Sequence, residues 1–80
     1  FDLNLYPNPN NGTFTIEPDK VIDGEVEMTV YNVLGKRVWQ SNSRDLVRET
    51  VDLSILESGI YLMDIRSENK IATKRFIIQR

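Results

Sequence analysis

The 80-residue sequence contains no cysteine and no histidine. Without cysteine the chain has no disulfide, no thiolate metal site and no thiol nucleophile. Without histidine it lacks the commonest general base and the commonest transition-metal ligand. These two absences remove most of the groups that catalytic and metal sites use, so we predict no catalytic residue, no metal site and no cofactor.

Long apolar runs are also absent. No run approaches the roughly 20 residues that span a bilayer, so no direct membrane insertion is expected. No basic segment followed by an apolar one marks an N-terminal signal peptide. Because the sequence starts at Phe1 rather than methionine, we expect residues 1–80 to be a single domain of a longer polypeptide.

Basic residues are concentrated at the end of the chain. The net charge is −2, which argues against a nucleic-acid partner. Positions 1–69 carry six basic and twelve acidic residues (−6), whereas the last eleven carry no acid and four basic residues (+4), Lys70, Lys74, Arg75 and Arg80. This basic end is either a solvated edge strand that lysines protect from aggregation or a surface for an acidic partner.

Apolar and polar residues alternate along most of the chain. The period of two is clear in residues 13–16, 25–30, 61–66 and 75–78, and residues 37–40 are also strand-like. Five pairs with turn chemistry separate these runs, namely Asn11-Gly12, Asp23-Gly24, Leu34-Gly35, Ser58-Gly59 and Glu68-Asn69. The pattern predicts an all-β fold, a small antiparallel β-sandwich of about seven strands.

Residues 45–57, DLVRETVDLSILE, are ambiguous. Leu46, Val47, Thr50, Val51 and Leu53 have spacings that a helix could use, with Gly59 as its C-terminal stop. Glu49, Val51 and Leu53 also alternate with Thr50 and Asp52. We favour a short strand at 48–52 followed by a turn through residues 54–58, with the helix as the alternative.

The stretch YPNPNNG at residues 6–12 raises the question of a ligand loop. A phosphate loop would need a lysine after Gly12, and a strand follows instead. A calcium loop would need acids, and from Tyr6 onward the first carboxylate is that of Glu17. The stretch is therefore predicted to turn the chain into the strand that carries Phe14 and Ile16.

Acids and aromatic residues offer only weak evidence of a site. Glu25, Glu27 and Asp64 fall on the strand face opposite the apolar residues, which indicates solvated acids rather than a catalytic pair. Trp39 and the three tyrosines could stack on sugars. The alternative places Tyr61 in the core and Trp39 over an edge or sheet face.

Four segments taken together resemble a known family. YPNPNNGTFTI, VYNVLGKRVW, VDLSILESGIYLMDI and NKIATKRFIIQR occur in the order found in the type A C-terminal sorting domains of proteins exported by the type IX (Por) secretion system of Bacteroidota. The resemblance runs from Leu5 to Arg80. The residues that match the family motifs are Pro7, Asn8, Pro9, Gly12, Gly35, Leu53, Gly59, Tyr61, Lys74, Arg75 and Arg80, although lysine is also common at the last position.

This resemblance implies an Ig-like sandwich that ends a larger secreted cargo and carries no catalytic activity. It implies that an outer-membrane translocon exports the cargo to the cell surface or medium. A sortase-like peptidase typically removes the domain, and the cargo is released or joined to lipopolysaccharide. The alternative function is an accessory module that binds carbohydrate or another surface.

The physical roles of the motif residues divide into two groups. We expect Gly59 to have a positive φ or a closely packed backbone, and Tyr61 to anchor the core with its hydroxyl hydrogen-bonded. Lys74, Arg75 and Arg80, on a last strand with unpaired backbone groups, are expected to contact an acidic or strand-accepting partner.

Overall fold

The computed structural model describes residues 2–68 and 70–80, which form seven β-strands and no helix. The strands are β1 (Leu3–Tyr6), β2 (Thr13–Pro18), β3 (Ile22–Tyr31), β4 (Arg37–Leu46), β5 (Glu49–Asp52), β6 (Gly59–Ser67) and β7 (Lys70–Ile78). The described part of the chain contains no helix that is long and apolar enough to cross a membrane. The predicted all-β class is confirmed.

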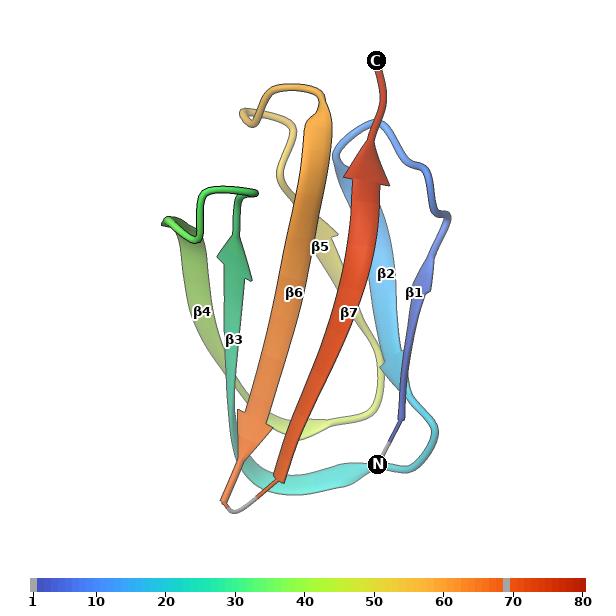
Figure 1. Cartoon of the computed structure of the whole chain (residues 1–80). Coiled ribbons are helices and arrows are strands. Elements are labelled where there is room, and N and C mark those ends of the chain that lie inside the picture. The colour runs from blue at the N-terminus through green and yellow to red at the C-terminus, as the bar shows by residue number, and fades with distance from the viewer. Residues whose placement is uncertain (1, 69) are drawn as a thin grey trace.

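The strands form two antiparallel sheets that face each other (Figure 1). One has the order β1-β2-β5 and the other β4-β3-β6-β7. This order differs from that of a constant-type immunoglobulin domain only in the fourth strand, which pairs with β3 instead of β5. The predicted sandwich is therefore confirmed.

The core lies between the inner faces of the two sheets. Phe14 of β2 and Phe76 of β7 are both buried, and their ring centroids are 4.8 Å apart across the sandwich. Alternate residues of β3 and β6 fill the rest of the core from the larger sheet, with Val26, Met28, Val30, Met63 and Ile65 all buried. The alternation read from the sequence thus places the correct residues inside.

The sequence did not reveal β1. Leu3 and Leu5 are buried and alternate with exposed neighbours, but a four-residue strand gives too short a pattern to recognise. In the ambiguous segment 45–57, the structure has the short strand β5, so the helical alternative is wrong.

One of the five predicted turns lies inside a strand. Asp23-Gly24 is not a turn but lies inside β3, where the register with β4 shifts between Ile22 and Glu25. Gly24 has a φ of +82° there, and its N–H donates to the Asp45 carboxylate at 2.7 Å, which are features of a bulge. Asn69 of the predicted turn Glu68-Asn69 lies outside the described residues.

The two termini lie at opposite ends of the sandwich (Figure 1). The Cα atoms extend over 33 Å along the longest axis. Four segments lie toward the end that holds the C-terminus: residues 7–12, 32–36, 53–58 and 79–80, with the 32–36 turn standing apart from the other three. We call this the motif end. The connection from β2 to β3 and that from β6 to β7 lie at the opposite end, with the start of β1.

Candidate functional site

The loop of residues 7–12 covers part of the outer edge of β7. The Asn8 side chain accepts a hydrogen bond from the Ile77 N–H at 2.9 Å and donates to the Arg75 carbonyl at 3.3 Å. The Asn10 N–H donates to the Ile77 carbonyl at 3.0 Å, and the Asn10 carbonyl accepts from the Gln79 N–H at 2.7 Å. The predicted turn into β2 is confirmed, but the expectation of unpaired backbone groups on the last strand is wrong over this part.

Asn10 is the buried polar centre of this loop. Its side chain accepts from the Gly12 N–H at 2.8 Å and donates to the Pro7 carbonyl at 3.0 Å. The Tyr6–Pro7 and Asn8–Pro9 peptide bonds are both cis. Sequence reasoning overlooked Asn10, although asparagine is a residue that commonly bonds the backbone of its own turn.

Gly12 joins the loop of residues 7–12 to that of residues 53–58. Its φ is +110°, and its carbonyl accepts the Leu53 N–H at 2.6 Å. A Cβ on Gly12 would lie 2.9 Å from Arg80 Nη2, 3.0 Å from Ser54 Cα and 3.1 Å from the Leu53 carbonyl oxygen. Both the φ angle and the close approach require glycine.

Arg80 folds back onto the same place. Its guanidinium Nη2 donates to the Leu53 carbonyl at 3.3 Å, and its N–H donates to Ser58 Oγ at 3.2 Å. Three of the predicted motif residues, Gly12, Leu53 and Arg80, thus come together from the beginning, middle and end of the chain.

Two ionisable side chains near the motif end have shifted pKa values. Hydrogen bonds from Ser54, with a smaller contribution from the Arg80 charge, hold the pKa of the Asp52 carboxyl below its ordinary value. The Tyr6 hydroxyl donates to the Glu17 carboxylate at 2.7 Å, and this bond raises the pKa of Tyr6. Neither group has the histidine or cysteine partner that would make it reactive.

Tyr61 has the predicted core position. Its ring is buried 5.8 Å from that of Phe76, and its hydroxyl donates to the Glu57 carbonyl at 2.7 Å. A hydroxyl that reaches back to the backbone before its strand resembles the tyrosine corner of immunoglobulin-like sandwiches. The expected positive φ of Gly59 is wrong, and a Cβ there would meet the Tyr61 ring at an ordinary distance of 3.7 Å.

The basic residues of β7 do not form one patch. Lys74 is opposite the buried Met63 in the register and lies half-buried on the core-facing side of β7. Arg75 is opposite Leu62 and exposed on the outer face. Because successive residues of a strand point to opposite sides, these neighbours in sequence are separated in space. An inward-pointing lysine also protects an edge strand from unwanted pairing.

Gly35 shapes the turn between β3 and β4. It has a φ of +81°, and its N–H donates to the Asn32 carbonyl at 3.0 Å. The Asn32 side chain accepts the N–H groups of Leu34 and Lys36, both at 3.0 Å. Sequence reasoning identified the glycine but missed Asn32, although asparagine three residues before glycine is a common turn pattern.

Exposed apolar side chains gather at and beside the motif end. Leu34 in the β3–β4 turn and Ile55 in the 53–58 loop are 88% and 89% exposed. On the outer face of the larger sheet, Ile60 pairs with Ile77 and Leu62 with Tyr31 in the register. Contiguous exposed apolar patches mark protein-binding surfaces, whereas single exposed apolar side chains are common on any protein.

Asp64 lies on the outer face, as predicted, but it is not solvated. It is 8% exposed and is opposite Thr29 and Thr73 in the register. One carboxylate oxygen accepts the Arg66 Nε–H at 3.3 Å, and the other has no hydrogen-bond partner among the described residues. No group of three or more acids within residues 2–68 and 70–80 could hold a metal ion.

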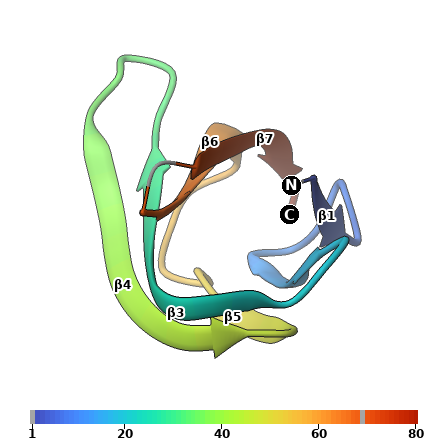
Figure 2. The ribbon, with the colours of Figure 1, turned by 90° about the horizontal axis from the view of Figure 1, so that it is seen from below.

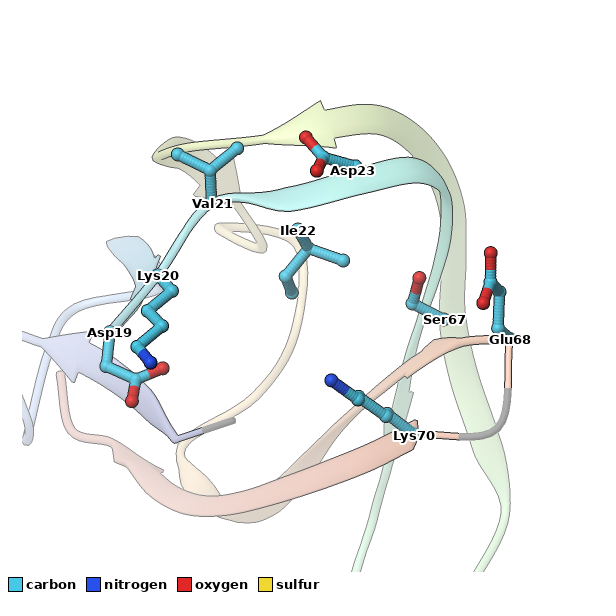
Figure 3. A pocket seen from close by; sticks show the side chains of 8 residues that line it. All are labelled: Asp19, Lys20, Val21, Ile22, Asp23, Ser67, Glu68 and Lys70. Carbon is cyan, nitrogen blue, oxygen red and sulfur yellow. The ribbon is translucent and has the colours of Figure 1, made fainter.

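An open hollow of about 550 Å³ lies at the end opposite the motif end (Figure 3). Residues 19–23 form one side of it, and Ser67, Glu68 and Lys70 form the other. Its charged side chains are two lysines and three acids, with no nucleophile and base held together. This arrangement does not support catalysis.

Trp39 lies opposite Val30 on the core-facing side of β4, where it is half-buried and packs against the core. Its ring is therefore not presented as a free platform for sugar stacking.

One protein-family model matches residues 4–79 of the chain, and the family is described as a secretion system C-terminal sorting domain. No curated protein sequence matches the chain.

Proposed function

The chain belongs to the family of secretion system C-terminal sorting domains, and from this we propose that its motif end is the surface that the secretion machinery binds. Such a domain is a sorting signal of the type IX secretion system, and the cargo is attached to its N-terminal side. The signal directs export to the cell surface or the medium.

The observation that carries the proposal is the convergence of the motifs at one end. Gly12, Leu53 and Arg80 touch one another there, while the N-terminus lies at the opposite end of the sandwich (Figure 1). Cargo that continues from the N-terminus therefore leaves the motif end free to meet a partner.

The chemistry of this end indicates the kind of partner. Exposed apolar side chains at Leu34, Ile55 and Leu62 lie at or beside it, together with the exposed guanidinium of Arg75. A complementary surface would be apolar with acidic residues at its rim. The proposed partners are the outer-membrane translocon and the sortase-like peptidase that removes the domain.

The family is non-catalytic in general, and we extend this to the chain itself. The absence of histidine and cysteine from the sequence supports this extension. Residues 1–80 would then act as one terminal domain of a larger secreted protein, with the cargo providing any activity.

A reporter fusion tests the function. Residues 1–80 are joined to the C-terminus of a reporter that has its own signal peptide, in hosts with and without the type IX secretion system. The reporter is expected at the surface or in the medium only when the system is present. Equal retention in the periplasm of both hosts would contradict the function.

A charge reversal tests the motif end. Arg75→Glu is compared with Lys20→Glu, which makes the same change of charge at an exposed residue that lines the hollow at the opposite end (Figure 3). Arg75→Glu is expected to reduce export at least tenfold and Lys20→Glu to leave it unchanged. Arg80 is left intact because its guanidinium bonds Leu53, so reversing its charge would disturb the fold. Equal export of the two variants would overturn the proposed surface.

A further inference from the structure

The two sheets together have four edge strands, and they are protected unequally. β1 and β5 are only four residues long, and the 7–12 loop covers the C-terminal part of β7. β4 is ten residues long and forms the outer rim of the larger sheet (Figure 2). β5 belongs to the other sheet and does not pair with it, although the Ser43 hydroxyl of β4 donates to the Glu49 carboxylate of β5 at 2.8 Å. The longest edge is therefore the least covered.

The direction of the β4 backbone groups follows from the register. Alternate residues of an antiparallel strand bond to opposite neighbours. Ile77 bonds the 7–12 loop through both its N–H and its carbonyl, so it faces away from β6. The same alternation can be carried from β7 through β6 and β3 to β4, because directly opposite residues either bond each other or both point away. It shows that the backbone N–H and C=O of Ser41 point toward β3. The backbone groups of its neighbours, Gln40 and Asn42, therefore point out from the edge.

The composition of β4 leaves this edge able to pair. Residues 38–43 contain no charged residue and no proline, two of the means of blocking an exposed edge. The register shift between Val30 and Tyr31 places a bulge only at the start of this segment, at Val38, so residues 39–43 remain regularly paired with β3. The charged residues of β4 occur only beside this segment, at Arg37, Arg44 and Asp45, and all three are exposed. The only ion pair that Arg44 makes with a described residue is an exposed contact of 3.7 Å with Glu25. Exposed ion pairs of this kind contribute little to stability.

We propose that the outer edge of β4 binds an extended segment of a secretion-machinery protein as an added strand. This inference rests on the proposed function. The segment would pair with the backbone of Gln40 and Asn42 and place acidic residues opposite Arg37 and Arg44. A second copy of this chain fits poorly, because antiparallel pairing of two β4 strands with aligned ends sets Arg37 of each copy against Arg44 of the other.

The test removes one outward N–H. Asn42→Pro eliminates a donor that the β3–β4 ladder does not use, and proline is tolerated on edge strands in such positions. Asn42→Ala is the matched control, because both variants lose the 2.9 Å bond from the Gln40 side chain but alanine keeps the N–H. In the reporter fusion, Asn42→Pro is expected to lower export at least tenfold relative to Asn42→Ala, with equal urea midpoints of the two free domains. Equal export would overturn the inference.

A second pair of variants decides the matter if Asn42→Pro does not fold. Arg37→Glu with Arg44→Glu is expected to reduce export at least tenfold. Lys20→Glu with Arg48→Glu makes the same change of charge at exposed residues away from the β4 edge and should not reduce it. Equal export of the two double variants overturns the inference. A purified domain that is a dimer and becomes monomeric on Asn42→Pro also overturns it, in favour of a second copy.

The inference and the function on which it rests fail in different ways. If the wild-type fusion is not exported, the sorting function itself fails. If wild-type export is normal and Arg75→Glu blocks it while both β4 variants are exported, the motif-end proposal stands and the β4 edge is not a binding site.

Discussion

Replacing Gly12 by alanine tests how the motif end is held together. The φ of +110° is one that alanine rarely adopts, and holding a residue in such a region costs about 1–3 kcal/mol. The new Cβ would also lie 2.9–3.1 Å from three atoms, two of which belong to the backbone of Leu53 and Ser54. Overpacking of this kind adds about 1–3 kcal/mol.

The combined loss of unfolding free energy for Gly12→Ala is therefore roughly 2–6 kcal/mol. At about 0.05–0.15 kcal/mol per residue, a domain of this length has about 4–12 kcal/mol of stability in total. The variant should lose a large fraction of it, which urea denaturation followed by circular dichroism would measure.

Gly35→Ala separates the two causes. Gly35 has a φ of +81° but no atom within 4 Å of its Cβ position, so its replacement carries only the backbone cost. We expect Gly12→Ala to lose at least about 1 kcal/mol more than Gly35→Ala, because only the former also overpacks its surroundings. Adding Arg80→Ala to Gly12→Ala relieves the contact with Nη2 but leaves both backbone contacts and removes the hydrogen bond to the Leu53 carbonyl, so it should not restore the difference. Equal losses at the two glycines would refute the packing argument.

Three further substitutions probe single interactions. Tyr61→Phe removes the hydrogen bond to the Glu57 carbonyl and should lower the free energy of unfolding by about 1 kcal/mol in urea; an unchanged value would contradict the role of the hydroxyl. Asp64→Thr replaces a buried carboxylate that has an unpartnered oxygen with a strand-favouring side chain. It should stabilise the domain by about 1 kcal/mol in the same assay. Destabilisation would show that the hydrogen bond from Arg66 contributes more than the unpartnered buried oxygen costs. Because the pKa of Asp52 is lower in the folded state than its ordinary value of 3.8, its charge stabilises the fold above that pH, and this contribution is lost as the pH falls through the lowered pKa. The stability difference between wild type and Asp52→Asn should therefore shrink in denaturation series taken below pH 4, and a constant difference would contradict the linkage.

The strands could be predicted because burial on one side imposes a local period. Val26, Met28 and Val30 are all buried as that period requires, and β1 was missed only because four residues give too short a pattern. Burial on the outer face was not predictable in the same way. Asp64 is covered there in the folded sheet, although the sequence shows only a polar residue at an outward position.

The contacts that build the motif end were not predictable from the sequence, because they join distant segments. Asn8 bonds Ile77, which is 69 positions away, and no local pattern indicates which edge a loop will cover. For two of the basic residues, closeness in the sequence was misleading. Lys74 and Arg75 are adjacent in sequence and suggest one charged surface, but strand geometry places them on opposite faces.

The bonds between the 7–12 loop and β7 span 67 and 69 positions, so they have a consequence for the order of synthesis. A polypeptide emerges N-terminus first, and the loop has no partner until nearly the whole domain has been made. The motif end is absent from a nascent, truncated or unfolded chain, since its parts then lie far apart. If the secretion machinery binds this end as proposed, it selects chains whose folding is finished.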